Sequence, residues 1–510
     1  MLPTKVHWMS RMPPLRRNQD SVIVGVFLGG CYSAAMLWLD FPSRRHGRGV
    51  CVWRCSPDVG NDLACTAMMS EMLTLRDSAW GRRSRRGLTQ RRDPAGIVIS
   101  SVATAAMLGG VSSAMAEPNR AGDFVGRWWW GSGSSAVQVE GASSADDWYR
   151  WEKMGYAPRS GDGNGFRSRF RDDFELLRKL GTTDHRLSIN WARVEPVEGR
   201  LDQEAVDYYR AVLSAAREAG LRVWACLLHT AIPLWFADRG GFAGGQAMEA
   251  WLRWVDLAAG VFGDLVGGWM PFNLPTSYAQ KGYLRGTFPP GHRDPAEFAA
   301  VLAAVHACDF EAALRLRETT GKPTCSNEAV LPLYPADDSP ETAAALTRMD
   351  RVVWGSWLGL AREPRYRKAF DLIGISYYYA MTVTSTGALL PFPEGRIPGP
   401  LGYVPWPDGI GVVLDRLRQE LPGARFVVAE VGYGDNGAFD DTERCEYMLR
   451  SLDCIAAAQD NGMRIDGVSI WTGIDNYEWL AGRSVPFGLF DNDRRPRRSA
   501  RLIRSLTRGR

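Results

Sequence analysis

A single carboxylate at the end of an apolar run is the clearest candidate for chemistry in this sequence. Residues 426–429 have the character of a buried strand, Glu430 follows them, and a glycine-rich turn continues to Gly434. A charge in this position is costly unless it has partners or a task. In a barrel of parallel strands, a polar residue at the carboxyl end of a strand indicates catalysis. The alternative is a structural ion pair, and this stretch alone does not separate the two.

Polar and aromatic residues follow other apolar runs in the same way. They are Gln138, Glu140, Arg186, His229, Asn273, Tyr377, Tyr378, Tyr379, Trp471, Glu478 and Trp479. The set mixes amides, an imidazole, carboxylates and flat aromatics without metal-ligand spacing, so we expect no metal and no cofactor. It suits a sugar, whose hydroxyls need polar partners and whose apolar face stacks on tryptophan. For His229, Trp471 and Trp479, packing in the core is the alternative.

The elements that must position these residues alternate between short apolar runs and longer segments with helical periodicity. We predict strands at 128–133, 183–189, 221–229, 268–273, 323–329, 372–376, 425–429 and 467–471. We predict helices at 170–180, 203–219, 246–262, 295–319 and 500–507, with Gly220 as a C-cap and further helices between the later strands.

Eight strand–helix units predict a closed (β/α)8 TIM barrel, an α/β fold, forming a single catalytic domain. A doubly wound open sheet is the alternative. It would require a Gly-x-Gly-x-x-Gly turn, and the candidate beginning at Gly131 and Gly133 lacks the third glycine. The barrel is therefore favoured.

Composition limits the partners. The chain has 510 residues and a net charge of +4 on 61 basic and 57 acidic residues, which gives no reason to expect nucleic acid. Five cysteines lie in the expected barrel, an odd and unclustered number that argues against a disulfide framework or a zinc site. We expect the partner to be a small-molecule glycoside or an oligosaccharide.

The region before the barrel differs from the rest in composition. Arg91 and Arg92, an apolar stretch at 96–110 and an Ala-x-Ala-type end at Ala116 predict an export signal of the twin-arginine type at 91–116. Residues 1–90 are then a disordered or mis-annotated extension with a true start at Met69 or Met72, and 120–510 form the barrel. An apolar run at 22–39 is an alternative anchor, and membrane contact is expected only through these segments. We expect an exported protein, or a cytoplasmic one if the N-terminus is mis-annotated.

Several ordered motifs give the chain a resemblance to glycoside hydrolase family 1, the retaining β-glycosidases, over roughly residues 124–508. They are 130–142, 186–196 with Gly199, Gly282-Tyr283 with 289–291, 373–378, Ala429-Glu430 and 471–479.

The resemblance implies a role for each site residue. Glu430 resembles the nucleophile, with Arg186 and Tyr378 beside it to hold it ionised and aimed. The residues that resemble the sugar-binding set are Gln138, His229, Asn273, Trp471, Glu478 and Trp479. Glu478 suits a glucose- or galactose-like ring.

The sequence departs from the family at the proton donor. Where the family has Asn-Glu-Pro after its fourth strand, with that glutamate as the acid/base, this chain has Asn273, Leu274 and Pro275. Leucine cannot carry a proton, and losing a positioned acid/base costs on the order of 10²–10⁴ in rate. Ser376 also replaces the family's usual asparagine, which is a milder change.

Three hypotheses follow. The chain is a retaining glycosidase or transglycosidase for sugars whose leaving group needs no proton. Alternatively, it is a catalytically impaired, exported carbohydrate-binding protein. In the third hypothesis another carboxylate, such as Glu328 near the end of the fifth strand, supplies the acid. Retention of Glu430 together with the sugar-binding set favours the first.

Overall fold

The computed structural model describes residues 124–434 and 440–508. The predicted extension at 1–90, the export signal at 91–116 and the alternative anchor at 22–39 lie outside the described residues. Within the described ranges, no helix has the length and apolar character needed to cross a membrane.

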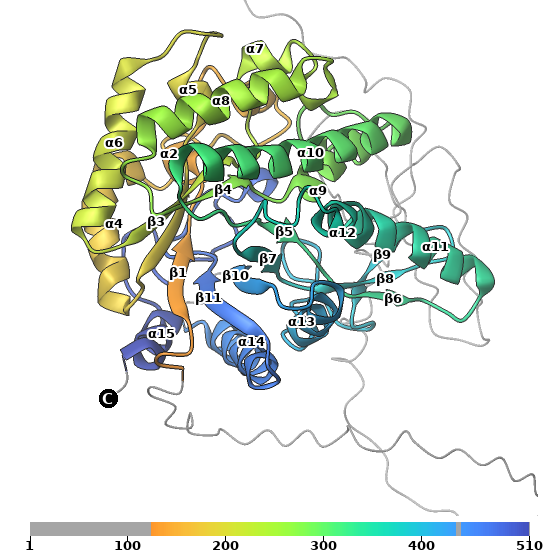
Figure 1. The fold of residues 1–510 in the computed structure, drawn as a ribbon. Coiled ribbons are helices and arrows are strands. Elements are labelled where there is room, and N and C mark those ends of the chain that lie inside the picture. The colour runs from red at the N-terminus through yellow and green to blue at the C-terminus, as the bar shows by residue number, and fades with distance from the viewer. Residues whose placement is uncertain (1–123, 435–439, 509–510) are drawn as a thin grey trace, which may run out of the picture. The chain divides into compact units, whose positions relative to one another are not determined.

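In the described part of the chain, eight parallel strands curl into a barrel, which confirms the predicted fold (Figure 1). Their order is β4-β3-β2-β1-β11-β10-β7-β5. The two ends of this order, β4 and β5, are joined by a parallel bridge between Trp269 in β4 and Thr324 in the segment that leads into β5. This bridge closes the barrel. The strands are β1 (Trp129–Gly133), β2 (Asp184–Ser188), β3 (Arg222–Leu228), β4 (Gly268–Phe272), β5 (Glu328–Ala329), β7 (Ile373–Tyr377), β10 (Arg425–Val431) and β11 (Arg464–Ile470).

The strands are apolar because both of their faces are covered. In β10, every residue after Arg425 is buried, and β3 shows the same pattern after Arg222. Parallel strands with helices outside and packed side chains inside read as continuous apolar runs. This is why a polar residue such as Glu430 stands out within β10.

Helices surround the barrel, and the five whose bounds were predicted begin and end within four residues of those bounds. They include α4 (Phe166–Leu180), α6 (Gln203–Glu218), α8 (Ala247–Phe262), α10 (Pro295–Thr320), α12 (Ser356–Arg362), α13 (Gly409–Glu420), α14 (Thr442–Asp460) and α15 (Arg498–Arg508). The Asp202 carboxylate caps α6 by accepting from the Ala205 amide, and Asp294 caps α10 in the same way. The helical periodicity of the apolar residues made these bounds predictable.

The fifth strand is much shorter than predicted. Of the expected 323–329, only Glu328–Ala329 forms a strand, with isolated bridges at Thr324 and Cys325. The Ser326 hydroxyl bonds both the amide and the carbonyl of Gly374 in the neighbouring strand, at 3.0 and 3.1 Å. A side chain therefore replaces part of the backbone ladder.

A second sheet was not predicted. Strands β6 (Leu333–Pro335), β8 (Ala380–Val383) and β9 (Leu389–Phe392) form it in the order β6-β8-β9. These strands follow β5 and β7, so the sheet extends the loops at the carboxyl ends of the barrel strands.

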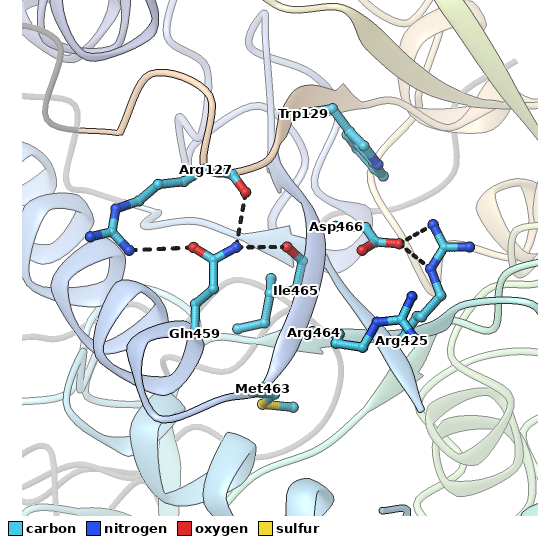
Figure 2. Close-up of a pocket in the computed structure, with 8 residues that line it drawn as sticks. All are labelled: Arg127, Trp129, Arg425, Gln459, Met463, Arg464, Ile465 and Asp466. Carbon is cyan, nitrogen blue, oxygen red and sulfur yellow. Dashed lines mark hydrogen bonds and ion pairs between the residues drawn. The ribbon is translucent and has the colours of Figure 1, made fainter. Parts of the chain in front are cut away.

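A hollow of about 510 Å³ lies at the other end of the barrel, where the strands begin (Figure 2). Arg425 and Arg464, the first residues of β10 and β11, line it together with Trp129. Asp466 pairs with Arg425 there at 2.5 Å. Because Glu430 lies near the carboxyl end of β10, this hollow is separate from the candidate site.

We expect Gly374→Ala to destabilise the barrel. A Cβ at Gly374 would lie 2.0 Å from the Ser326 carbonyl oxygen and 2.8 Å from the Cys325 sulfur, where the short fifth strand meets β7. Overpacking of this kind costs about 1–3 kcal/mol, so the midpoint of denaturant unfolding should fall. Gly359→Ala in α12 is the control, because nothing lies within 4 Å of the added Cβ. Equal midpoints for the two variants would contradict the close approach.

Candidate active site

Glu430 lies at the carboxyl end of the barrel and is held by donors from three other elements. It is 3% exposed. Arg186 Nη2 donates to its Oε1, the Tyr378 hydroxyl donates to its Oε2 at 2.5 Å, and Asn327 Nδ2 lies 3.4 Å from Oε1. The carboxylate is therefore both paired and fixed in orientation at the rim where barrels carry their active sites.

Arg186 connects this carboxylate to the neighbouring strand ends. Its side chain, on β2, is 1% exposed and lies in an ion pair with Glu430. Its Nη1 lies 2.8 Å from His229 Nδ1 and donates to Asn273 Oδ1 at 3.1 Å. Its guanidinium also lies 5.0 Å from the centre of the Trp471 ring. Residues at the ends of β3, β4, β10 and β11 thus meet at one cation.

His229 is a neutral member of this group. Burial lowers its pKa well below the usual range, and the neighbouring Arg186 acts in the same direction. Its ring stacks with the Trp471 ring at 5.7 Å, and its Nε2 lies 3.1 Å from Asn273 Nδ2. The imidazole therefore contributes hydrogen bonding to the site and no positive charge.

Asn327 belongs to the site but was missed in the sequence. Its Nδ2 donates to Asn273 Oδ1 at 2.6 Å, and its Oδ1 accepts from the Ser376 hydroxyl at 2.8 Å. The signal was a polar residue at the end of the fifth apolar run, but the adjacent Glu328 was singled out instead. Ser376, noted as a departure from the family, keeps a hydrogen bond in this network.

The structure argues against Glu328 as a proton donor for the site. Adjacent residues on a strand point to opposite faces, and Asn327 is the one that faces Glu430. Glu328 is fully buried and lies 3.3 Å from His306 Nε2 on α10. The hypothesis that Glu328 supplies the acid is therefore wrong in its geometry.

Gln138 and Glu140 were both expected at the rim, but they lie in different surroundings on α2 (Ala136–Glu140). Glu140 accepts from the Tyr209 hydroxyl at 2.9 Å and pairs with Arg193 at 3.5 Å, between α2 and the surrounding helices. Gln138 is fully buried, and its Nε2 has no hydrogen-bond partner among the described residues. Gln138 therefore keeps a donor for a ligand, whereas Glu140 has a structural ion pair.

The segment after β11 supplies two aromatic rings and a carboxyl group. Trp471 Nε1 donates to Glu478 Oε1 at 3.4 Å, and the Trp479 ring stacks with the His229 ring at 6.2 Å. Burial raises the pKa of Glu478 to about 8, and the Glu430 carboxylate adds to the rise, while the Trp471 bond opposes it. At neutral pH the Glu478 carboxyl is thus protonated and can donate as well as accept.

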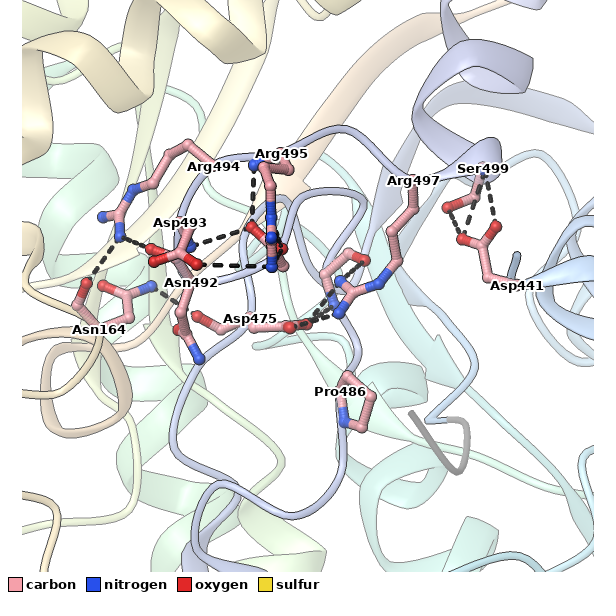
Figure 3. Close-up of polar contacts among 12 residues, drawn as sticks. Asn164, Asp441, Asp475, Pro486, Asn492, Asp493, Arg494, Arg495, Arg497 and Ser499 are labelled. Carbon is pink, nitrogen blue, oxygen red and sulfur yellow. Dashed lines mark hydrogen bonds and ion pairs between the residues drawn. The ribbon is translucent and has the colours of Figure 1, made fainter. Parts of the chain in front are cut away.

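Buried ion pairs fix the conformation of this segment (Figure 3). The Asp475 carboxylate pairs with Arg497 at 2.6 Å and accepts from the Gly488 amide at 2.7 Å. Arg494 pairs with Asp173 on α4 at 2.8 Å. The loop that carries Trp471, Glu478 and Trp479 is consequently anchored at Asp475, and the segment that supplies its cation is anchored to α4.

Leu274 occupies the position directly after Asn273 at the end of β4. Its backbone has a φ of 53°, and its amide donates to the Asn327 carbonyl at 2.9 Å. A left-handed conformation in a non-glycine residue costs about 1–3 kcal/mol and is found most often at functional sites. The side chain at this strained position is a hydrocarbon, so it cannot transfer a proton.

A parallel barrel with one clamped carboxylate, amides and stacked indoles at its carboxyl rim defines a sugar-processing enzyme of the (β/α)8 class. Known proteins agree with this class. The sequence pattern described as Glycosyl hydrolase family 1 matches residues 120–371 and 400–508. The chain belongs to glycosyl hydrolase family 1.

Individual relatives are distant but cover most of the chain. Coniferin beta-glucosidase of Pinus contorta is 25% identical over 470 residues, which cover 75% of this chain and 92% of that protein. Beta-glucosidase A of Thermotoga maritima is 26% identical over 410 residues, which cover 71% and 91%. The solved beta-glycosidase from Pyrococcus horikoshii superposes with a TM-score of 0.69 at 25% identity, covering 76% of this chain and 95% of that one.

We expect Glu478 to make stability fall as pH rises. Its pKa is about 8 in the folded chain and about 4.5 when unfolded, so between these values only the folded state holds the proton. The free energy of unfolding contributed by this group is therefore lost from about pH 4.5 through pH 8, and the loss is on the order of a few kcal/mol. Glu478→Gln should flatten the decline in denaturant unfolding between pH 5 and pH 8. An unchanged decline would contradict the burial of this carboxyl.

Proposed function

We propose that the chain is a retaining β-glycosidase or transglycosidase of the β-glucosidase class that works through a covalent glycosyl-enzyme on Glu430. The main support is the position of the Glu430 carboxylate, which accepts hydrogen bonds from Arg186 and Tyr378 and lies among the proposed sugar-binding groups. The relatives named beta-glucosidases support the same class.

In the first step, Glu430 Oε attacks the anomeric carbon while the bond to the leaving group breaks. Arg186 and Tyr378 each donate to one carboxylate oxygen, which fixes the attacking group. Gln138, whose Nε2 has no partner among the described residues, and the protonated Glu478 provide hydrogen bonds for sugar hydroxyls. Trp471 offers a flat face to the ring.

The second carboxyl of a retaining site is missing from this scheme. Retaining enzymes place two carboxyl groups about 5–5.5 Å apart, one as nucleophile and one as acid/base. We infer that Leu274 stands at the acid/base position, because it follows Asn273 where the family has Asn-Glu-Pro. The substrate must then carry a leaving group that departs without a proton, and water attacks the glycosyl-enzyme without help from a base.

A sugar-binding protein without turnover is the second candidate. Leu274 also favours this function, because loss of the acid/base is a direct way to lose catalysis while the sugar-binding groups remain. The two candidates differ in whether Glu430 becomes glycosylated.

We expect an activated 2-fluoro β-glucoside to add one sugar mass to the protein in intact mass spectrometry, with the modification on Glu430. A dinitrophenyl β-glucoside should release dinitrophenol, whereas methyl and alkyl glucosides should react at least about 10²-fold more slowly because no acid assists them. Absence of an adduct, or an adduct that persists in Glu430→Gln and Glu430→Ala, would overturn the nucleophile assignment. Sugar binding without any adduct would support the second candidate.

Leu274→Glu should create the missing proton donor. We expect turnover of alkyl glucosides to rise by roughly 10²-fold or more, and a basic limb to appear in the pH profile, because the new carboxyl can protonate the leaving oxygen. Leu274→Gln is the matched control, with nearly the same volume as glutamate and no transferable proton. Equal rates in the two variants would show that residue 274 does not face the leaving group.

A further inference from the structure

Lys281 lies close to the candidate site and has no assigned task. It is in η2 (Gln280–Leu284), the π-helical turn that continues α9 (Pro275–Ala279), and therefore follows Leu274 on the same helical segment. Its Nζ lies 4.7 Å from the centre of the Phe288 ring. That ring is 5.6 Å from the Trp479 ring, so the ammonium stands beside an aromatic wall of the site.

The charge of Lys281 is felt by the groups around Glu430. Its ammonium interacts with the Glu430 carboxylate and with Glu478 when that group is ionised, and it helps to lower the pKa of His229. Burial lowers the pKa of Lys281 itself, Arg285 acts in the same direction, and Glu430 and the ionised form of Glu478 oppose this. The ammonium is thus partly removed from water and lies within electrostatic reach of the Glu430 carboxylate.

This cation has no counter-ion of its own. Among the described residues, no carboxylate comes within ion-pair distance of Lys281, and Glu430 is already paired with Arg186. A partly buried charge without a partner is unfavourable unless a ligand supplies one. An ammonium is a compact point charge that suits carboxylate and phosphate oxygens.

We propose that Lys281 binds the oxyanion of a leaving group or acceptor, a carboxylate or a phosphate, on the aglycone side of the sugar. The proposal rests on the proposed glycosyl-enzyme at Glu430. A positive charge at this place would compensate for the missing acid/base. A group that leaves as a stable oxyanion is stabilised by a neighbouring cation and needs no proton.

The two half-reactions balance without a proton donor or a base. When the donor reacts, the Glu430 carboxylate forms a bond to the anomeric carbon, and the bonding electrons of the breaking bond leave with the carboxylate or phosphate oxygen. In the return step an oxyanion attacks the same carbon, and the electron pair goes back to Glu430. Lys281 keeps its proton throughout and neutralises the charge of the anion in both steps.

The test is transfer from dinitrophenyl β-glucoside to acetate, to inorganic phosphate and to methanol. In the natural protein, acetate or phosphate should accelerate dinitrophenol release more than methanol does, and mass spectrometry should detect glucosyl acetate or glucosyl phosphate. The more effective anion identifies a carboxylate or a phosphate as the ligand. In Lys281→Met the ratio of anion-driven to methanol-driven rate should fall by about tenfold or more, as expected for a lost charge-assisted bond.

Two variants separate this effect from general damage. Lys281→Arg keeps the charge and should retain the preference for anions. Arg285→Met removes a neighbouring exposed charge and should change the ratio less than Lys281→Met does. An unchanged ratio in Lys281→Met, or a natural protein that prefers methanol, would overturn the role of Lys281. Absence of any adduct on Glu430 would instead overturn the proposed function, and this inference with it.

Discussion

The buried ion pair between Arg186 and Glu430 is the constraint on which the rest of the site depends. Two charges are taken out of water, and removing either partner from such a pair costs about 3–5 kcal/mol. The pair is tolerated because Tyr378, Asn273 and His229 bond other polar atoms of the two side chains, although Arg186 Nε has no partner among the described residues. The same network that compensates for burial aims the carboxylate at the rim of the barrel. The same hydrogen bonds are therefore needed both for the stability of the buried pair and for the orientation of the carboxylate.

Much of this arrangement could be predicted from the sequence. Residues 426–429 are apolar and Glu430 is not, so the end of the strand was visible, and repetition of that pattern gave the barrel. Asn327 was not recognised, because it lies in a short polar run where β5 forms only two residues of strand. The serine side chain that replaces the ladder there, Ser326, bonds a residue distant in sequence, which no local pattern reveals. Lys281 was also missed, since one lysine on a helical turn resembles any solvated position.

The direction in which a side chain points decided where sequence reasoning failed. Glu140 and Glu328 are carboxylates close to strand ends, as Glu430 is, but Glu140 contacts Tyr209 on α6 and Glu328 lies beside His306 on α10. Strand ends in a barrel alternate between the interior and the outer layer of helices, and a one-residue difference changes the face. Residue type and approximate position were thus sufficient to assign Glu430 to the site, because several motifs agreed. They were insufficient to assign isolated carboxylates such as Glu140 and Glu328.

The anchoring of the loop after β11 makes the site depend on residues that contribute nothing to the barrel strands. Asp475 is held by Arg497, and Asp173 by Arg494, and both arginines follow every strand of the barrel in the sequence. The hydrogen bonds of the eight strands close the sheet without these arginines, but the loop that carries Trp471, Glu478 and Trp479 is held by them. The geometry of the proposed site therefore depends on charges that lie outside the barrel strands and outside the loop that carries its aromatic rings.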